Sequence, residues 1–204
     1  QLVKEADKRG LSVVCGTQRR FHEGYQELVK RIQDGELGEI TSAQCYWDMG
    51  VYIGQWVNFP DLDKDSIEYQ IRSWWCFNWT SGDHIVEQHV HNIDVILWAL
   101  GDKRMPVDVR GMGGRSTDLP VPEFGDRFSH FAIDYDMGGG VRMASYCQQD
   151  PGCSDIIGER VVGTKGQTWS DEGGNIYIDD LKGKRIWTAN QPQTSALVNE
   201  HKAL

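Results

Sequence analysis

SGDHIVEQHVHNIDVILWALG, residues 81–101, is the most strongly patterned segment of the chain. With roughly 100° between successive residues, a helix would divide this segment into two sides. One side would carry the polar side chains of His84, Glu87, Gln88, His91 and Asp94. The other would carry the apolar side chains of Ile85, Val86, Val90, Ile93, Ile96, Leu97 and Leu100. Ser81 or Asp83 can cap the start and Gly101 suits the end, so we predict one amphipathic helix.

Glu87 and His91 stand four residues apart and would meet on the polar side of that helix. A carboxylate beside an imidazole orients the ring and raises its basicity, which suits general acid–base catalysis near neutral pH. A hydrogen bond between the two with no further role explains the spacing equally well. His89 points into the apolar side, where a core histidine with a satisfied hydrogen bond is the better interpretation.

Other signatures of cofactor and metal sites are weak in this sequence. The glycines at 111, 113 and 114 fail the dinucleotide pattern GxGxxG because residue 116 is serine, and neither a P-loop nor a GxSxG elbow occurs. His84, Glu87 and His91 could hold a metal, but their spacing is not that of HExxH. Acid–base catalysis with a cofactor supplied from elsewhere is the better interpretation, so we predict no metal site.

The composition is that of an acidic globular chain. Of its 204 residues 39% are hydrophobic, which is enough for one domain with a substantial core. Lys plus Arg number 21 and Asp plus Glu number 30, which gives a net charge of −9. Nucleic acid and anionic membranes are therefore not expected partners. Eight Trp, seven Tyr and six Phe could stack on sugar faces or fill a core.

The cysteines favour a reducing compartment. They are odd in number and form no CxxC motif, which argues against a disulfide or zinc framework; they are Cys15, Cys45, Cys76, Cys147 and Cys153. No apolar run approaches the ~18 residues of a membrane span. No signal peptide is visible, so we expect a cytoplasmic protein, although a longer precursor could carry a leader.

The start of the chain has the pattern of half a βαβ unit. Residues 1–10 predict the end of a helix, and the apolar run at 11–15 predicts a buried strand. Residues 16–21 would follow the carboxyl end of that strand, where ligands bind in open α/β sheets. Arg19 and Arg20 could meet a phosphate or a carboxylate there, and a solvated turn accounts for them equally well.

The remaining pattern predicts an α/β (α+β) fold with an open, mostly antiparallel sheet flanked by helices. Residues 25–35 predict a helix and residues 40–49 a strand, whereas residues 59–70 are polar. After residue 101, short strands recur between turn signals, at 107–113, 127–135, 141–148, 156–162, 167–170, 175–178 and 185–188. Three glycines at 138–140 predict a hairpin, and residues 189–204 predict a loop and the start of a last helix.

Residues 72–80, RSWWCFNWT, place four aromatic side chains directly before the patterned helix. Aromatic rings in this position could form a wall of a sugar-binding pocket. An aromatic core of their own is the alternative. We take the pocket wall as the prediction.

Three segments together resemble the glucose–fructose oxidoreductase/inositol dehydrogenase (Gfo/Idh/MocA) family of NAD(P)-dependent oxidoreductases. They are GTQRRFHEGYQELVKRIQDGELGEI at 16–40, SGDHIVEQHVHNIDVILWALG at 81–101 and GTKG at 163–166. The resemblance implies a Rossmann domain, of which residues 1–22 would be the last helix and strand. Residues 23–204 would form the C-terminal substrate-binding and oligomerisation domain. The main NAD or NADP loop and the family's catalytic lysine would then lie before Gln1.

The resemblance also implies roles for individual residues. His91 falls on the family's catalytic histidine, which accepts the proton of the substrate hydroxyl. Glu87 stands where the family usually has aspartate, and His89 where it usually has glycine. Gln18 and Arg19 would approach the nicotinamide side of the cofactor. The remaining predicted contacts are with the sugar, from Trp74, Trp75, Asn78, His84 and Asp94.

Three functional hypotheses follow. The first is the catalytic part of an NAD(P)-dependent oxidoreductase acting on a sugar, glycoside or cyclitol hydroxyl. The second is a carbohydrate-binding or assembly module without redox activity. The third is a glycoside-cleaving member of the family that uses transient oxidation. In each case the implied partners are a small sugar or polyol and, through the antiparallel sheet, further copies of the chain.

Overall fold

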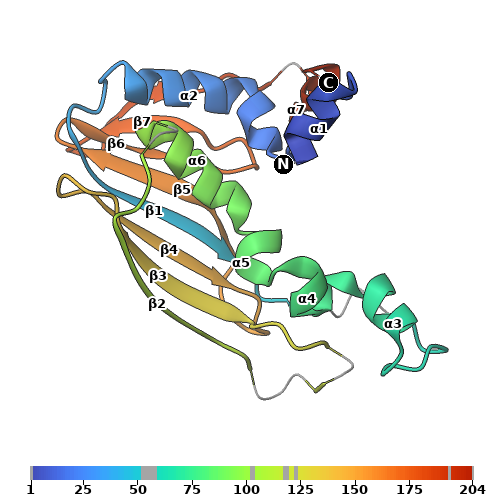
Figure 1. Cartoon of the computed structure of the whole chain (residues 1–204). Coiled ribbons are helices and arrows are strands. Elements are labelled where there is room, and N and C mark those ends of the chain that lie inside the picture. The colour runs from blue at the N-terminus through green and yellow to red at the C-terminus, as the bar shows by residue number, and fades with distance from the viewer. Residues whose placement is uncertain are drawn as a thin grey trace.

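A computed structural model of the chain shows one mixed sheet with helices packed on one face (Figure 1). It describes residues 2–51, 59–101, 104–116, 120–121, 124–192 and 194–203. Across the sheet of the described residues the strand order is β2-β3-β4-β1-β5-β6-β7-β8. The strands are β1 (Ile40–Asp48), β2 (Asp108–Gly114), β3 (His130–Asp136), β4 (Arg142–Gln148), β5 (Ile156–Gly163), β6 (Gly166–Trp169), β7 (Tyr177–Asp180) and β8 (Arg185–Thr188).

The strand pairing confirms the open, mostly antiparallel sheet. Only β1 and β4 run parallel among the paired strands, with Cys45 opposite Ser145. On its other side β1 is antiparallel to β5, which places Cys45 opposite Glu159. Gly138, Gly139 and Gly140 all have positive φ in the turn between β3 and β4, a conformation that side chains with a Cβ disfavour. The strand pattern alone did not show the parallel pair, because that pairing depends on a long crossover.

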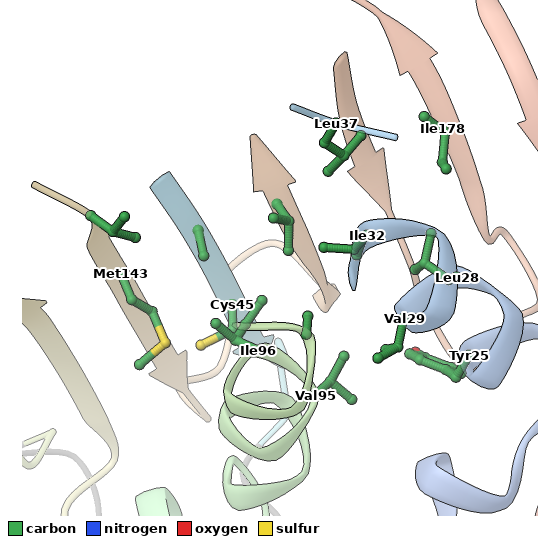
Figure 2. Close-up of a cluster of buried hydrophobic side chains, with 14 of the residues drawn as sticks. Tyr25, Leu28, Val29, Ile32, Leu37, Cys45, Val95, Ile96, Met143 and Ile178 are labelled. Atoms are coloured by element: carbon green, nitrogen blue, oxygen red, sulfur yellow. The ribbon is translucent and has the colours of Figure 1, made fainter. Parts of the chain in front are cut away.

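Helices α2 (Glu23–Gln33) and α6 (Val90–Leu100) lie over the sheet and close its core. Figure 2 shows side chains of α2, α6 and the strands meeting in one apolar layer. Tyr25, Leu28 and Ile96 are at most 1% exposed within it. The His22 ring accepts hydrogen bonds from the first-turn amides of α2, which fixes where this helix begins. The helix predicted at residues 25–35 is thereby confirmed.

The segment predicted as one helix is broken. It comprises the end of α4 (Asn78–Ser81), then α5 (His84–Glu87) and α6. Gly82 and Asp83 both have positive φ, which separates α4 from α5, and Asp83 caps α5 through the amide of His84. Between α5 and α6 the amide of His89 donates to the carbonyl of His84, five residues back. This wider turn interrupts the regular ladder, so residues on either side do not share the side that an unbroken helix would give them.

The apolar run at residues 11–15 is not a strand. Helix α1 (Leu2–Lys8) precedes it and ends before Gly10, as predicted. Residues 11–15 have no regular structure, and Leu11 and Val13 are 59% and 58% exposed. A strand needs a neighbouring edge, and none of the described segments pairs with this run. The prediction of a buried strand at residues 11–15 is therefore wrong.

Smaller helices lie around the sheet and its two covering helices. Figure 1 shows α3 (Ile67–Arg72) and α4 beyond the end of the sheet, and η3 (Trp74–Cys76) lies between them in the chain. Helix α7 (Ala196–Ala203) contacts η1 (Gln18–Phe21), a short 3₁₀ helix. The sequence pattern predicted α7 as the last helix.

The sheet face that points away from α2 and α6 carries a row of aromatic rings. Tyr46 stacks on Tyr146 with 5.8 Å between ring centroids, and Trp169 lies 6.5 Å from Tyr46. A Cβ on Gly158 would meet the Trp169 ring at 2.7 Å, so the glycine lets the indole lie flat across β5. Tyr146 remains 43% exposed, which makes this face a partly apolar surface.

Candidate functional site

His91 lies in the first turn of α6, against the ring of Trp47 on β1, with 6.0 Å between the ring centroids. Its ring is half-buried, and Nδ1 has no hydrogen-bond partner among the described residues. Burial, and then the positive charge of Arg19, lower the pKa of His91. The carboxylates that oppose this shift are Glu172, Asp94 and Glu200. A neutral imidazole is the form that accepts a proton, so His91 is suited to act as a base.

Glu87 lies before the helix break and contacts a different set of groups. Gln88 Nε2 donates to Glu87 Oε1 at 2.7 Å, and Arg127 Nη1 lies 3.7 Å from Glu87 Oε2. No hydrogen bond or ion pair joins Glu87 to His91 within the described ranges. The expected contact between these two side chains is therefore wrong, because the turn at His89 separates them. Burial raises the pKa of the Glu87 carboxyl, while Gln88 and Arg127 oppose the shift.

His84 and His89 are fully buried and belong to the core. The Nε2 of His89 lies 2.7 Å from Ser145 Oγ and 3.6 Å from Cys45 Sγ, which confirms the core interpretation. His84 Nε2 donates to the carbonyl of Trp47 at 3.3 Å. Burial lowers the pKa of each ring to about 3. His84 is 0% exposed, so the prediction that it touches the substrate does not fit this geometry.

Arg19 is buried in an ionic network instead of facing solvent. Its Nη1 donates to Glu159 Oε1 at 2.5 Å, and its Nε donates to Glu172 Oε1 at 3.1 Å. Gln18 Nε2 donates to the same Glu172 oxygen at 3.2 Å. Arg19 also lies over the Trp47 ring, 5.6 Å from its centroid. The carboxylate that the arginine pair was expected to meet is thus supplied by the chain itself.

Glu159 is a site residue that sequence reasoning missed. It lies on the inner face of β5, is 1% exposed, and accepts four hydrogen bonds, from Arg19, Asn92, Tyr25 and Ser170. Burial raises the pKa of the Glu159 carboxyl to about 7, and Arg19 and the other donors pull it down. The signal was present in the sequence: in IIGERVV the alternation places a carboxylate on the same side as Val161.

Asp94 is occupied by a second arginine. Arg20 donates to both carboxylate oxygens of Asp94, with Nε to Oδ2 at 2.8 Å and Nη2 to Oδ1 at 2.9 Å. This bidentate pair ties η1 to α6 and leaves the Arg20 side chain 30% exposed. Asp94 is therefore a structural partner of η1 in this chain, and the sugar contact predicted for it would require the pair to open.

The predicted aromatic wall divides between a small core and a surface. Phe77 and Cys76 are buried with Tyr69 in a second apolar cluster, which is the alternative considered from the sequence. Trp74 is 40% exposed and packs edge-on against Trp75, at 5.3 Å between centroids, whereas Asn78 is exposed.

Arg127 links Trp75 to Glu87. The carbonyl of Trp75 accepts a hydrogen bond from Arg127 Nη1, the same nitrogen that lies near Glu87. Arg127 is fully buried and also donates to Gln149. Sequence reasoning missed Arg127. It predicted a strand from residue 127, whereas β3 begins at His130 and Arg127 lies in the preceding loop, and a single arginine there carries no pattern that could have revealed its role.

A cavity of about 290 Å³ lies between η1 and α7. It is lined by Gln18, Arg19, His22, Tyr25, Glu172, Pro192, Ser195, Ala196 and Leu197. The structure thus brings the two predicted cofactor residues, Gln18 and Arg19, to one cavity. His91 and Glu87 do not line it.

Two features of the described residues bear on other functions. No group of three or more His, Cys, Asp or Glu side chains in that part of the chain is arranged to hold a metal ion. None of its helices has both the length and the apolar character needed to cross a lipid bilayer.

Comparisons with known proteins show similarity in structure alone. No protein-family model matches the chain, and no curated protein matches it in sequence. A super-repressor mutant of Gal80p from Saccharomyces cerevisiae is similar with a TM-score of 0.72 and 16% identity, over 99% of this chain and 52% of that one. Aldose-aldose oxidoreductase from Caulobacter crescentus, complexed with glycerol, is similar with a TM-score of 0.69 and 18% identity, over 98% of this chain and 55% of that one. GenD2 from gentamicin A biosynthesis, complexed with NAD, is similar with a TM-score of 0.68 and 18% identity, over 100% of this chain and 55% of that one.

These similarities confirm the fold that the resemblance implied. The chain has the α/β fold found in the C-terminal part of Gfo/Idh/MocA-type oxidoreductases. It spans about half the length of each of the three similar structures.

Proposed function

We propose that this chain is the substrate-binding and catalytic part of an NAD(P)-dependent oxidoreductase that acts on a hydroxyl of a sugar, glycoside or cyclitol. The similar structures include an aldose-aldose oxidoreductase and an NAD complex, which supports this class of reaction. The side chains around the α5–α6 break provide the chemical support for the proposal.

One observation about these side chains carries the proposal. Trp75 Nε1, Glu87 Oε2 and His91 Nδ1 are each buried without a hydrogen-bond partner among the described residues. Most buried polar atoms in native structures have a partner, so these three atoms require an explanation, as do Arg19 Nη2 and His84 Nδ1 among the other predicted site residues. A polyol carries both hydrogen-bond donors and acceptors. If it binds beside α5 and α6, its hydroxyls would supply the hydrogen-bond partners that these three atoms lack.

In the proposed mechanism His91 accepts the proton of the reacting hydroxyl. Burial and the Arg19 charge keep the imidazole neutral, so it has a lone pair available before the reaction. As the carbinol carbon loses its hydride, the hydroxyl oxygen releases its proton to His91 and the C–O bond becomes a carbonyl. Glu87, which does not contact His91, binds a second hydroxyl of the substrate and helps to orient it.

The residues around η1 fit one end of a nicotinamide cofactor. The cavity between η1 and α7 offers the amide of Gln18, the carboxylate of Glu172 and the hydroxyl of Ser195. Its volume of about 290 Å³ lies at the lower end of ligand pockets, so it would take the nicotinamide end and not a whole dinucleotide. When bound, NAD or NADP supplies the hydride acceptor.

The dinucleotide-binding domain itself would lie outside residues 23–204. We propose that residues 1–22 belong to that domain, because Leu11 and Val13 expose an apolar run that would pair well in a parallel sheet. The half-length match to the similar structures supports the same division.

A second copy of the chain would cover the open face of the sheet. Tyr46, Tyr146 and Trp169 form a contiguous aromatic row there, and such rings are enriched at protein interfaces. We propose a homo-oligomer that buries this row.

The experiment is an assay of the complete gene product that contains this chain. Sugars, glycosides and cyclitols are supplied with NAD⁺ or NADP⁺, and reduction is followed by absorbance. Substrate-dependent reduction supports the proposal. Tight binding of a sugar without any nicotinamide binding or turnover would contradict it.

That second outcome would favour a binding or regulatory module. The similarity to a super-repressor mutant of Gal80p is the observation that supports this alternative. Titration with NADH, followed by its fluorescence, separates the two, because the module predicts no saturable nicotinamide signal. Product analysis separates net oxidation from glycoside cleavage through transient oxidation.

A further inference from the structure

We propose that Glu159 is the positioning residue of this site, which fixes the His91 ring through Asn92 and Arg19. The inference rests on the proposed role of His91 as the base. Glu159 is not a catalytic residue in this account, because it contacts neither the reacting atoms nor His91 itself.

The hydrogen bonds of Glu159 join four separate segments. Oε1 accepts from Arg19 Nη1 at 2.5 Å and from Asn92 Nδ2 at 2.7 Å, which belong to η1 and α6. Oε2 accepts from Tyr25 on α2 at 3.2 Å and from Ser170 at 2.7 Å. A carboxylate that accepts four hydrogen bonds has both oxygens fully used, so it holds these segments in one arrangement.

The first route from Glu159 to His91 runs through Asn92. Asn92 follows His91 directly in the first turn of α6 and is 0% exposed. Its bond to Glu159 anchors that turn to β5, immediately after the irregular turn at His89. A helix start that lacks a capping side chain, as this one does, depends on such tertiary anchors for its exact position.

The second route runs through Arg19 and Trp47. Glu159 holds the Arg19 guanidinium 5.6 Å from the centroid of the Trp47 ring. The same ring lies 6.0 Å from the His91 ring. Glu159 therefore fixes both the backbone beneath His91 and the aromatic surface beside it.

The charge environment of His91 gives a readout of this arrangement. The charged groups that act on its pKa are Arg19 on η1, Glu172 after β6, Asp94 on α6 and Glu200 on α7. Arg19 is the positive member, and Glu159 and Glu172 together hold it beside Trp47. If Glu159 is removed, Arg19 keeps only Glu172 as a carboxylate partner and shifts toward it, and the His91 ring becomes better hydrated, so both causes of its lowered pKa weaken.

The test is a histidine NMR titration of the 204-residue chain in four forms. Glu159→Ala removes the anchor, and Glu159→Gln keeps an acceptor for Asn92 and Arg19. Ser170→Ala removes a donor to Glu159 that leads to neither Asn92 nor Arg19. In Glu159→Ala we expect the His91 titration midpoint to rise toward the ordinary histidine value, with altered ring-current shifts from Trp47. In Glu159→Gln and in Ser170→Ala, the His91 titration midpoint and the ring-current shifts should stay near those of the parent chain.

The proposal is overturned if folded Glu159→Ala leaves the His91 shifts and midpoint unchanged, or if Ser170→Ala moves them as far. If Glu159→Ala does not fold, Asn92→Ala decides, because it cuts one route and leaves the Arg19–Glu159 pair in place. Unchanged His91 signals in that variant contradict the proposal. Since these signals need no substrate, positioning can hold even if His91 proves unnecessary for turnover, so the two failures are distinguishable.

Discussion

Glu159 accepts a 2.7 Å hydrogen bond from the side chain of Asn92, 67 residues before it in the chain. This contact joins β5 in the sheet to the helix turn that carries His91. It explains how a half-buried imidazole can be held precisely after an irregular turn. It also implies that the buried ionic network on the sheet and the proposed catalytic base are parts of one structure.

Two adjacent arginines should differ strongly in their effect on stability. Arg19→Ala leaves Glu159 as an unpaired buried carboxylate, which should reduce the free energy of unfolding by about 3–5 kcal/mol. Arg20→Ala removes a pair whose side chains are 30% and 16% exposed, which should cost about 1 kcal/mol or less. Urea denaturation of both variants measures the difference. Equal losses would show that the Arg19–Glu159 pair is not buried as described.

Acid should destabilise the fold through its two buried histidines. Burial lowers the pKa of His84 and of His89 to about 3, below the ordinary value of 6.5 that each ring regains on unfolding. A depressed folded pKa stabilises the fold fully above the unfolded value, and this stabilisation is lost as the pH falls from 6.5 toward 3. Each ring should contribute a loss of about 1.4 kcal/mol per pH unit inside that window.

The measurement is the free energy of unfolding of the parent chain and of His89→Gln between pH 7 and pH 4. Subtracting one curve from the other removes the opposite contributions of Glu159 and Asp48, whose pKa values burial raises to about 7 and about 6. The variant should lose less stability than the parent on acidification. His201→Gln, at an exposed position, is the matched control. If it reduces the pH dependence of the free energy of unfolding as much as His89→Gln does, the effect does not come from the buried ring.

Gly125 should tolerate no side chain. Its φ is +65°, and an added Cβ would lie 1.8 Å from the carbonyl oxygen of Cys76. Gly125→Ala should therefore reduce stability by about 3 kcal/mol or more and disturb the loop that carries Arg127. Gly140 also has positive φ, but its Cβ would meet nothing within 4 Å, so Gly140→Ala should cost only about 1–2 kcal/mol. Thermal unfolding compares the two, and similar melting temperatures would disprove the clash.

The open sheet face should control self-association. Tyr146→Arg places a charge in the aromatic row and should shift the complete protein toward a smaller species in sedimentation velocity. Ile71→Arg, on the distant α3, changes a residue that is 56% exposed and should leave the sedimentation unchanged. If both variants sediment as the parent protein does, this face is not an interface.

The sequence allowed most of the fold to be predicted, because the strands and α2 depend on local alternation and on glycine turns. It misled in two places. The run at residues 11–15 has the apolar character of a buried strand, but pairing is a tertiary property. The helix at 81–101 was predicted as continuous, since the 3.6-residue pattern does not reveal a wide turn such as the one from His84 to His89.

The site was predictable only in part, for a related physical reason. The residue types at 84–94 indicated acid–base chemistry, and the structure leaves His91 accessible to that role. The partners that shape it, Trp47, Arg127 and Glu159, come from distant segments whose approach no local pattern encodes. Of these, only Glu159 had a signal, as a charge on the inner face of an apolar strand.

The central claim is that His91 moves the substrate proton, and the most direct test is kcat/KM of His91→Ala in the complete gene product. His201→Ala serves as the control, and the substrate is the best one found in the sugar panel. A general base typically contributes about 10²–10⁴-fold, so kcat/KM should fall by at least about a hundredfold, with the control unchanged. A loss of less than about tenfold would contradict the account, because it lies well below that range.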